Sequence, residues 1–256
     1  MAENPDISLL LEGLKEHNNK DLEKVALISS SEDVMLRPLT VGQQKKLVGT
    51  LISQSTSELT FDATLGEIIL ENNTTKQEIY SIDIPFVLLQ LRVNLMGKSI
   101  TLTLEDQEYD INIYKHIGKM KKTFATGVKT GYTLSEGDIH LQCSSPTLSR
   151  ECKISREATE YVNSKHDSMI DAAGDVYLIE VLKQIVSVTV GDNKIDMNDL
   201  DIESAVSLVS NIPYSLTKKI ITKTGEFSSI IDKISTPDGL PDGVPMDIDG
   251  RLFTGE

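Results

Sequence analysis

The 256-residue chain contains no tryptophan, only two cysteines and few basic side chains. Its 39 acidic residues outnumber its 25 lysines and arginines, which gives a formal net charge of -14. A surface this acidic repels phosphate backbones and anionic lipid headgroups, so we expect no nucleic-acid partner. Two cysteines can form neither a disulfide framework nor a four-sulfur zinc site.

Long hydrophobic runs are also missing. No segment approaches the roughly 18 apolar residues of a membrane-spanning helix, and residues 1–6 carry no basic region typical of a signal peptide. We therefore expect no membrane span, no secretion, and reduced thiols in a cytosolic setting.

The sequence pattern divides the chain into three segments. Residues 1–33 have leucines at roughly helical spacing and are predicted to be a flexible N-terminal appendage with one or two loose helices. Residues 34–234 form the body, for which a split near residues 135–155 is the alternative. Residues 235–256 are rich in proline, glycine and aspartate and are predicted to be an extended tail that cannot build a core of its own.

Capping signals predict two helices early in the body. Thr40 with Gln43 forms a capping box before a helix with one apolar face. Asp83 and Pro85 favour a helix start and Gly97 a helix end, so residues 83–97 are predicted to form a buried helix. The alternation of apolar residues from 89 to 95 leaves a strand as the competing interpretation.

The remaining patterns predict short antiparallel hairpins and further helices, which defines an α+β fold. Hairpins are expected at 99–105 with 108–114, at 132–134 with 138–142, and at 187–190 with 194–197. Helices are expected near 62–70, 155–173, 176–186 and 199–210, the last with Asp199 as its N-cap. A helix opening at Pro213 and a separate short element over 227–234 complete the body. Residues 115–133 are predicted to be a polar, basic loop.

Two features are candidates for partner binding. The basic segment contains Lys119, Lys121 and Lys122 and could meet an acidic partner surface, with a solvated loop as the alternative. The tail carries apolar anchors that suggest docking in extended form on a neighbouring protein, with an unbound terminus as the alternative. These anchors are Leu240, Val244, Met246, Ile248, Leu252 and Phe253.

No residue pattern defines a catalytic or cofactor site. His140, Cys143 and Cys152 are weak zinc candidates, because eight residues separate the cysteines and a fourth ligand is missing. We therefore predict no metal, no cofactor and no enzymatic activity. The alternative is a small hydrolase whose site forms only in three dimensions, around His140 or His166 with an acid and a nucleophile.

Three motifs together resemble a known family. An extended segment through Arg37-Pro38 leads into the first helix, the segment from Ile82 to Arg92 contains Asp-Ile-Pro, and a late helix opens with Asn211-Ile212-Pro213 and continues to Lys218. Over residues 34–235 this order resembles the baseplate hub assembly protein family of T-even-type contractile-tailed bacteriophages.

The resemblance implies a non-enzymatic role as an assembly factor or minor component of the baseplate hub. Other hub or tail proteins would be the partners, in the host cytoplasm during assembly or in the virion tail baseplate, and oligomerisation within the assembly is a further expectation. Whether such a protein is a permanent subunit or a transient chaperone is left open by the sequence.

Overall fold

The structure is a computed structural model that describes residues 22–52, 58–105, 107–166, 172–241 and 244–246; for residues 47–52 and 58–62 it describes the backbone alone. It confirms the α+β class, with short antiparallel sheets among helices. The described helices are α2 (Val41–Ile52), α3 (Glu58–Asn72), α4 (Ile84–Met96), α5 (Ile113–Thr123), α6 (Leu148–Lys165), α7 (Ala173–Gln184), α8 (Ile202–Ser210) and α9 (Tyr214–Ser235).

The described strands form three sheets. Two are hairpins: β1 (Glu23–Ala26) with β2 (Asp33–Leu36), and β3 (Ser99–Leu104) with β4 (Gln107–Asn112). The third is a four-stranded antiparallel sheet in the order β5-β6-β7-β8. Its strands are β5 (Gly131–Glu136), β6 (Ile139–Ser144), β7 (Ile185–Val190) and β8 (Asn193–Asp196).

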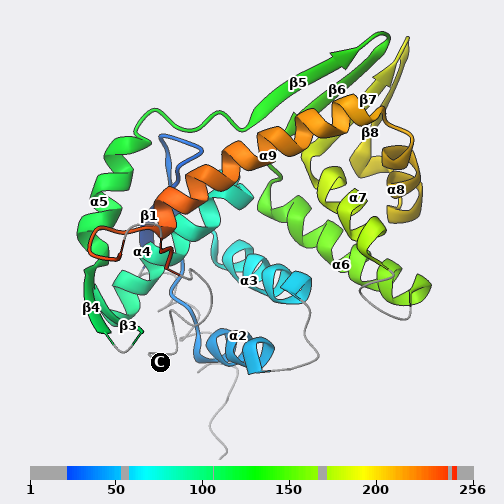
Figure 1. Ribbon diagram of the computed structural model, residues 1–256. Helices are drawn as coiled ribbons and strands as arrows, with labels where there is room; N and C mark the ends of the chain where they lie inside the picture. The colour runs from blue at the N-terminus through cyan, green and yellow to red at the C-terminus, as the bar shows by residue number, and fades with distance from the viewer. Residues whose placement is uncertain (1–21, 53–57, 106, 167–171, 242–243, 247–256) are drawn as a thin grey trace, which may run out of the picture.

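Helix α9 connects two parts of the hydrophobic interior. In Figure 1 the four-stranded sheet and α5 lie on opposite sides of the molecule, and α9 runs from one to the other. Leu216 and Ile220 near its start pack with the sheet, α7 and α8, whereas Phe227 and Ile234 pack with α4 and α5. The two separate elements expected over 213–234 are therefore one 22-residue helix. Gly225 does not interrupt it, because packing on both sides outweighs the low helix propensity of a single glycine.

The buried helix expected over 83–97 is confirmed as α4. Pro85 lies in its first turn, Gly97 ends it with a φ of 98°, and every residue from Phe86 to Arg92 is buried. Asp83 occupies the N-cap position, but its side chain does not cap the helix. Its carboxylate instead accepts hydrogen bonds from the backbone N–H groups of Ile28 and Ser29, each at 2.9 Å.

Residues 22–28 differ from the helix expected there. Glu23–Ala26 is a strand that pairs with β2, so one hairpin includes residues on both sides of the division expected at 33 and 34. Gln90 of α4 stabilises the strand, since its amide accepts from the Ala26 N–H and donates to the Ala26 carbonyl, both at 2.9 Å. This tertiary contact overrides the local helical spacing. The helices expected at residues 1–21 lie outside the described residues.

Three further expectations need correction. Residues 113–123 form a helix, α5, where the end of a strand and the first part of a loop were expected. Helix α6 begins at Leu148, seven residues before the expected start, and its N-cap is Thr147. Asp201, and not Asp199, caps α8, because its side chain accepts from the Ser204 N–H at 2.8 Å while Asp199 lies in a preceding 3-10 turn. The other hairpins are confirmed at or near the predicted residues.

Candidate partner-binding surface

Helix α5 separates a buried apolar stripe from an exposed basic face. Its N-cap is Asn112, whose side chain accepts from the Lys115 N–H at 2.8 Å. The stripe has the i, i+3, i+4, i+7 spacing of an amphipathic helix and is formed by Ile113, His116, Ile117 and Met120. The predicted basic residues Lys119, Lys121 and Lys122 are all exposed. They are therefore presented by a helix, on the solvent side.

The first part of the tail packs against α5 and the end of α9. The Met246 N–H donates to the Ser235 carbonyl at 2.6 Å, and the Met246 side chain is 4% exposed in the cluster that includes Ile111 and Ile113. Lys119 forms an ion pair with Asp238 at 2.7 Å. Beside this contact, a groove of about 470 Å³ is lined by Lys119, Met120, Thr123, Asp232, Lys233 and Thr236.

The predicted tail anchors differ in their placement. Met246 is buried against its own chain, and Leu240 and Val244 are half-buried. The hydrophobic surface of Met246 is therefore already used within the molecule. Ile248, Leu252 and Phe253 lie outside the described residues, and their contact with a partner stays a prediction.

A hydrogen bond of His116 connects α5 to the end of α9. Its Nε2 lies 2.8 Å from the Ile234 carbonyl oxygen, which requires the proton on Nε2. Burial lowers the His116 pKa, and the Ile234 carbonyl and Asp238 oppose that effect only in part. The histidine is therefore a neutral packing residue on the buried side of α5.

The weak metal candidates lie in different surroundings. Cys143 belongs to the cluster around the four-stranded sheet and Cys152 to the cluster around α3 and α4, while His140 is exposed and bonds Ser135 at 2.8 Å. Burial raises the pKa of the Cys143 thiol to about 12 and that of Cys152 to about 11. Within the described ranges, no three histidine, cysteine or acidic side chains are grouped as metal ligands.

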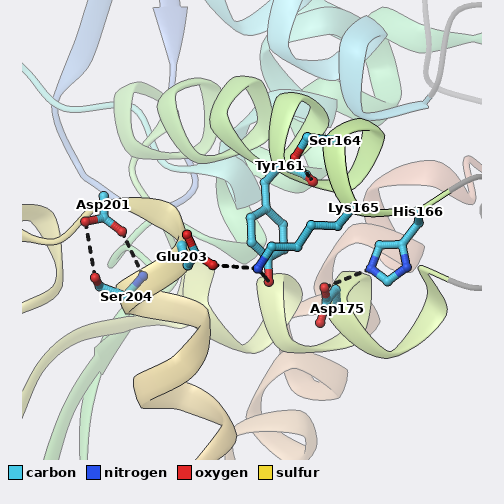
Figure 2. Close-up of polar contacts among 8 residues, drawn as sticks. All are labelled: Tyr161, Ser164, Lys165, His166, Asp175, Asp201, Glu203 and Ser204. Carbon is cyan, nitrogen blue, oxygen red and sulfur yellow. Dashed lines mark hydrogen bonds and ion pairs between the residues drawn. The ribbon is translucent and has the colours of Figure 1, made fainter.

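The histidines needed for a hydrolase are also not assembled into a triad. Figure 2 shows His166 at the end of α6, with its Nε2 3.0 Å from a carboxylate oxygen of Asp175 in α7. Beside it, Lys165 reaches Glu203 of α8 at 2.7 Å. Among the hydrogen bonds of the described residues, His166 has an acid but no nucleophile, and His140 has a hydroxyl but no acid.

Sequence reasoning missed a polar cavity at the end of β5 and β6 that lies away from their turn. It has a volume of about 610 Å³, and its lining includes Lys129, Arg150 and Lys183. Lys183 is buried and lies 2.7 Å from both Glu151 and Glu180; burial disfavours its charged form, but the two carboxylates raise its pKa overall. No local pattern could reveal this site, because its residues come from separate elements.

Arg150 holds a charge in this cavity without a carboxylate in direct contact. Its guanidinium donates to the carbonyls of Leu182 and Ile185 and, at 3.2 Å, to the Asn198 side chain. Burial lowers its pKa, yet a guanidinium stays protonated in proteins. The cavity therefore holds three cationic side chains, of which Lys183 is paired with two carboxylates and Arg150 contacts no carboxylate directly.

Comparison with known proteins defines the class to which this fold and surface belong. A family model described as T4 bacteriophage base plate protein matches residues 21–232. The chain belongs to this family, and the match begins 13 residues before the expected resemblance, so it includes the β1–β2 hairpin. Searches of curated proteins and of solved structures find no match.

Family membership makes this a structural protein of the phage tail baseplate, where it contacts other tail proteins. In the part of the chain that the structure describes, no helix is long and apolar enough to cross a membrane.

Proposed function

We propose that the protein acts in assembly of the baseplate hub, as an assembly factor or minor hub component that binds other hub or tail proteins in the host cytoplasm. The observation that carries this proposal is the exposed basic face of α5 on a chain of net charge -14. Such a local reversal of charge favours an acidic partner and steers its approach.

The basic face keeps cations available for a partner. Lys119 is paired with Asp238, whereas Lys121 and Lys122 have no ion pair with the described residues. Both lie in the last turn of α5, where the helix dipole favours positive charge. Because they are exposed, their contribution to folding is small and their substitution is a test of binding.

The test is co-expression of the full chain with the other baseplate proteins of the phage that encodes it, followed by affinity measurement on the complex. The double substitution K121E/K122E is expected to weaken binding about tenfold at low salt, equivalent to about 1.4 kcal/mol, and less at high salt. K218E/K219E is the matched control, because these adjacent lysines are exposed on α9. Equal losses in both variants would contradict the role of α5.

The tail anchors beyond the described residues are a second proposed contact. Removal of residues 247–256 keeps Met246 in place and deletes Ile248, Leu252 and Phe253. We expect the shortened chain to fold normally and to assemble less efficiently. Undiminished assembly would refute a role of these anchors in docking on a neighbour.

Mass spectrometry of purified particles separates the two forms of the proposal. A permanent hub component is present in the finished baseplate in fixed proportion to the other subunits. A transient chaperone is found only in complexes isolated before the tail is complete.

A further inference from the structure

Among the strands that the structure describes, β5 is an unpaired edge of the four-stranded sheet. A two-residue turn at Gly137-Asp138 joins it to β6, with Glu136 opposite Ile139. Residue pairs in an antiparallel ladder alternate between hydrogen-bonded and non-bonded, and a two-residue turn is closed by a bonded pair. The backbone groups of Thr133 and Ser135 therefore point away from β6, and both residues are exposed.

The edge at β5 lacks most of the sequence features that usually prevent strand addition, although α9 contacts β5 through Phe227 on Tyr132 and Ser215 on Glu136. It is six residues long, its register with β6 is regular, and it contains no proline and a single charge, at Glu136. The opposite edge, β8, has four residues and carries Lys194 and Asp196. Proteins protect exposed edges with short strands, charges, prolines or bulges, so β8 is protected and β5 is open.

The cation-lined cavity lies at the start of this same edge. Lys129, Thr130 and Gly131 form part of its wall, together with Arg150 and Lys183. Lys183 is neutralised by Glu151 and Glu180, but Arg150 contacts only carbonyl and amide oxygens. Lys129 is exposed and, within the described part of the chain, forms no ion pair. The lining itself contains one acid, Glu78, while Asp196 and Glu151 lie near enough to favour the charged form of Arg150.

We propose that β5 receives an extended segment of another baseplate protein as a fifth strand, and that this segment carries an acidic side chain at the end of β5 near Lys129 and Arg150. In strand addition, main-chain hydrogen bonds supply affinity and a side-chain pocket supplies specificity. The inference rests on the proposed function, since it names the site at which that binding takes place.

A second copy of the chain fits this edge less well. Each copy carries a net charge of -14, so two copies repel each other. Glu136 is the only acid in β5, and its carboxylate already accepts a hydrogen bond from the Ser215 hydroxyl of α9. Pairing of β5 with β5 therefore brings no free acid to the cation-lined end.

Residue-resolved hydrogen exchange on the free chain and on the complex with co-expressed baseplate proteins tests the proposal. The amides of Thr133 and Ser135 should exchange quickly in the free chain and become protected in the complex, because only then do they have partners. Amides that pair with β6, such as that of Leu134, should be protected in both states. A complex that forms without protection at Thr133 and Ser135 would overturn the strand-addition site and leave the proposed function standing.

Two pairs of variants check the same site through affinity. T133P removes an outward N–H of β5, and we expect it to lower affinity about tenfold. K194P removes an outward N–H of β8, and we expect it to change affinity by less than about twofold. K129E should weaken binding and K194E should not. Circular dichroism establishes that each variant is folded.

Other outcomes count against the proposal. If the amides of Thr133 and Ser135 become protected in the isolated chain as its concentration rises, the occupant is a second copy and the heterologous partner is refuted. If the wild-type chain forms no complex with any baseplate protein, both the proposed function and this inference fail.

Discussion

Removal of the Asp83 carboxylate is the strongest single test of how the N-terminal hairpin is held on the body. The carboxylate accepts four hydrogen bonds: from the N–H groups of Ile28 and Ser29 at 2.9 Å, from the Ser29 hydroxyl at 2.7 Å and from the Tyr80 N–H at 2.9 Å. Asp83 is fully buried. In D83A three backbone donors lose their acceptor where replacement by water is restricted.

The expected loss of unfolding free energy follows from the donors that lose their acceptor. Each buried donor left without an acceptor destabilises the folded state by about 1–3 kcal/mol. The variant also no longer buries a carboxylate, which offsets part of this loss, so D83A should lower the free energy of unfolding by about 3–5 kcal/mol. D83N keeps one acceptor oxygen and should cost about 1–2 kcal/mol.

Urea unfolding followed by far-UV circular dichroism and tyrosine fluorescence measures these differences; the chain has no tryptophan to report them. D232A, on the exposed face of α9, is the control and should change stability by less than about 0.5 kcal/mol. A loss of less than about 1 kcal/mol in D83A would refute the reasoning, because the four hydrogen bonds would then not fix the hairpin.

Three further predictions concern the interior. Burial raises the folded-state pKa of Asp83 above its ordinary 3.8 although its donors lower it, so ionisation is less favourable in the folded chain than in the unfolded one. The wild-type unfolding free energy should therefore be highest below about pH 4 and fall as pH rises through the raised pKa; D83N should lack this fall, and a parallel pH dependence of both proteins would contradict it. In G66A, the added methyl meets the Cys152 sulfur and, at 2.8 Å, a methyl of Leu148. Overpacking of α3 on α6 should lower the unfolding free energy by about 1–3 kcal/mol, and calorimetry that shows no loss would refute this close packing. The thiols of Cys143 and Cys152, with pKa values of about 12 and about 11, should resist a thiol reagent at pH 8 until urea unfolds the chain, whereas fast reaction of the native protein would show that they are accessible.

The parts of the fold that sequence predicts are those with local causes. The Thr40–Gln43 capping box forms as expected, with the Thr40 N–H donating to the Gln43 side chain at 3.0 Å and the Gln43 N–H donating to the Thr40 hydroxyl at 3.2 Å. The hairpin turn at Gly191-Asp192 is likewise set by its own residues, since Gly191 adopts a φ of 58°.

The parts that sequence misses depend on distant residues. Strand β1 forms where its backbone meets Gln90, which lies 64 positions from Ala26 in the chain. The sequence pattern does not reveal helix α5, because lysines lie between the residues of its buried stripe. Only the packing of Ile117 and Met120 shows which face of the helix is buried. The cavity around Arg150 and Lys183 depends on α6 meeting α7, which no local pattern encodes.

The continuity of α9 has a mechanical consequence. Its 22 residues span about 33 Å, with one end fixed beside the four-stranded sheet and the other beneath α5 and the start of the tail. A rod of this kind transmits displacement with little bending. A displacement of the sheet is therefore expected to reach the opposite end of the molecule, where the tail begins.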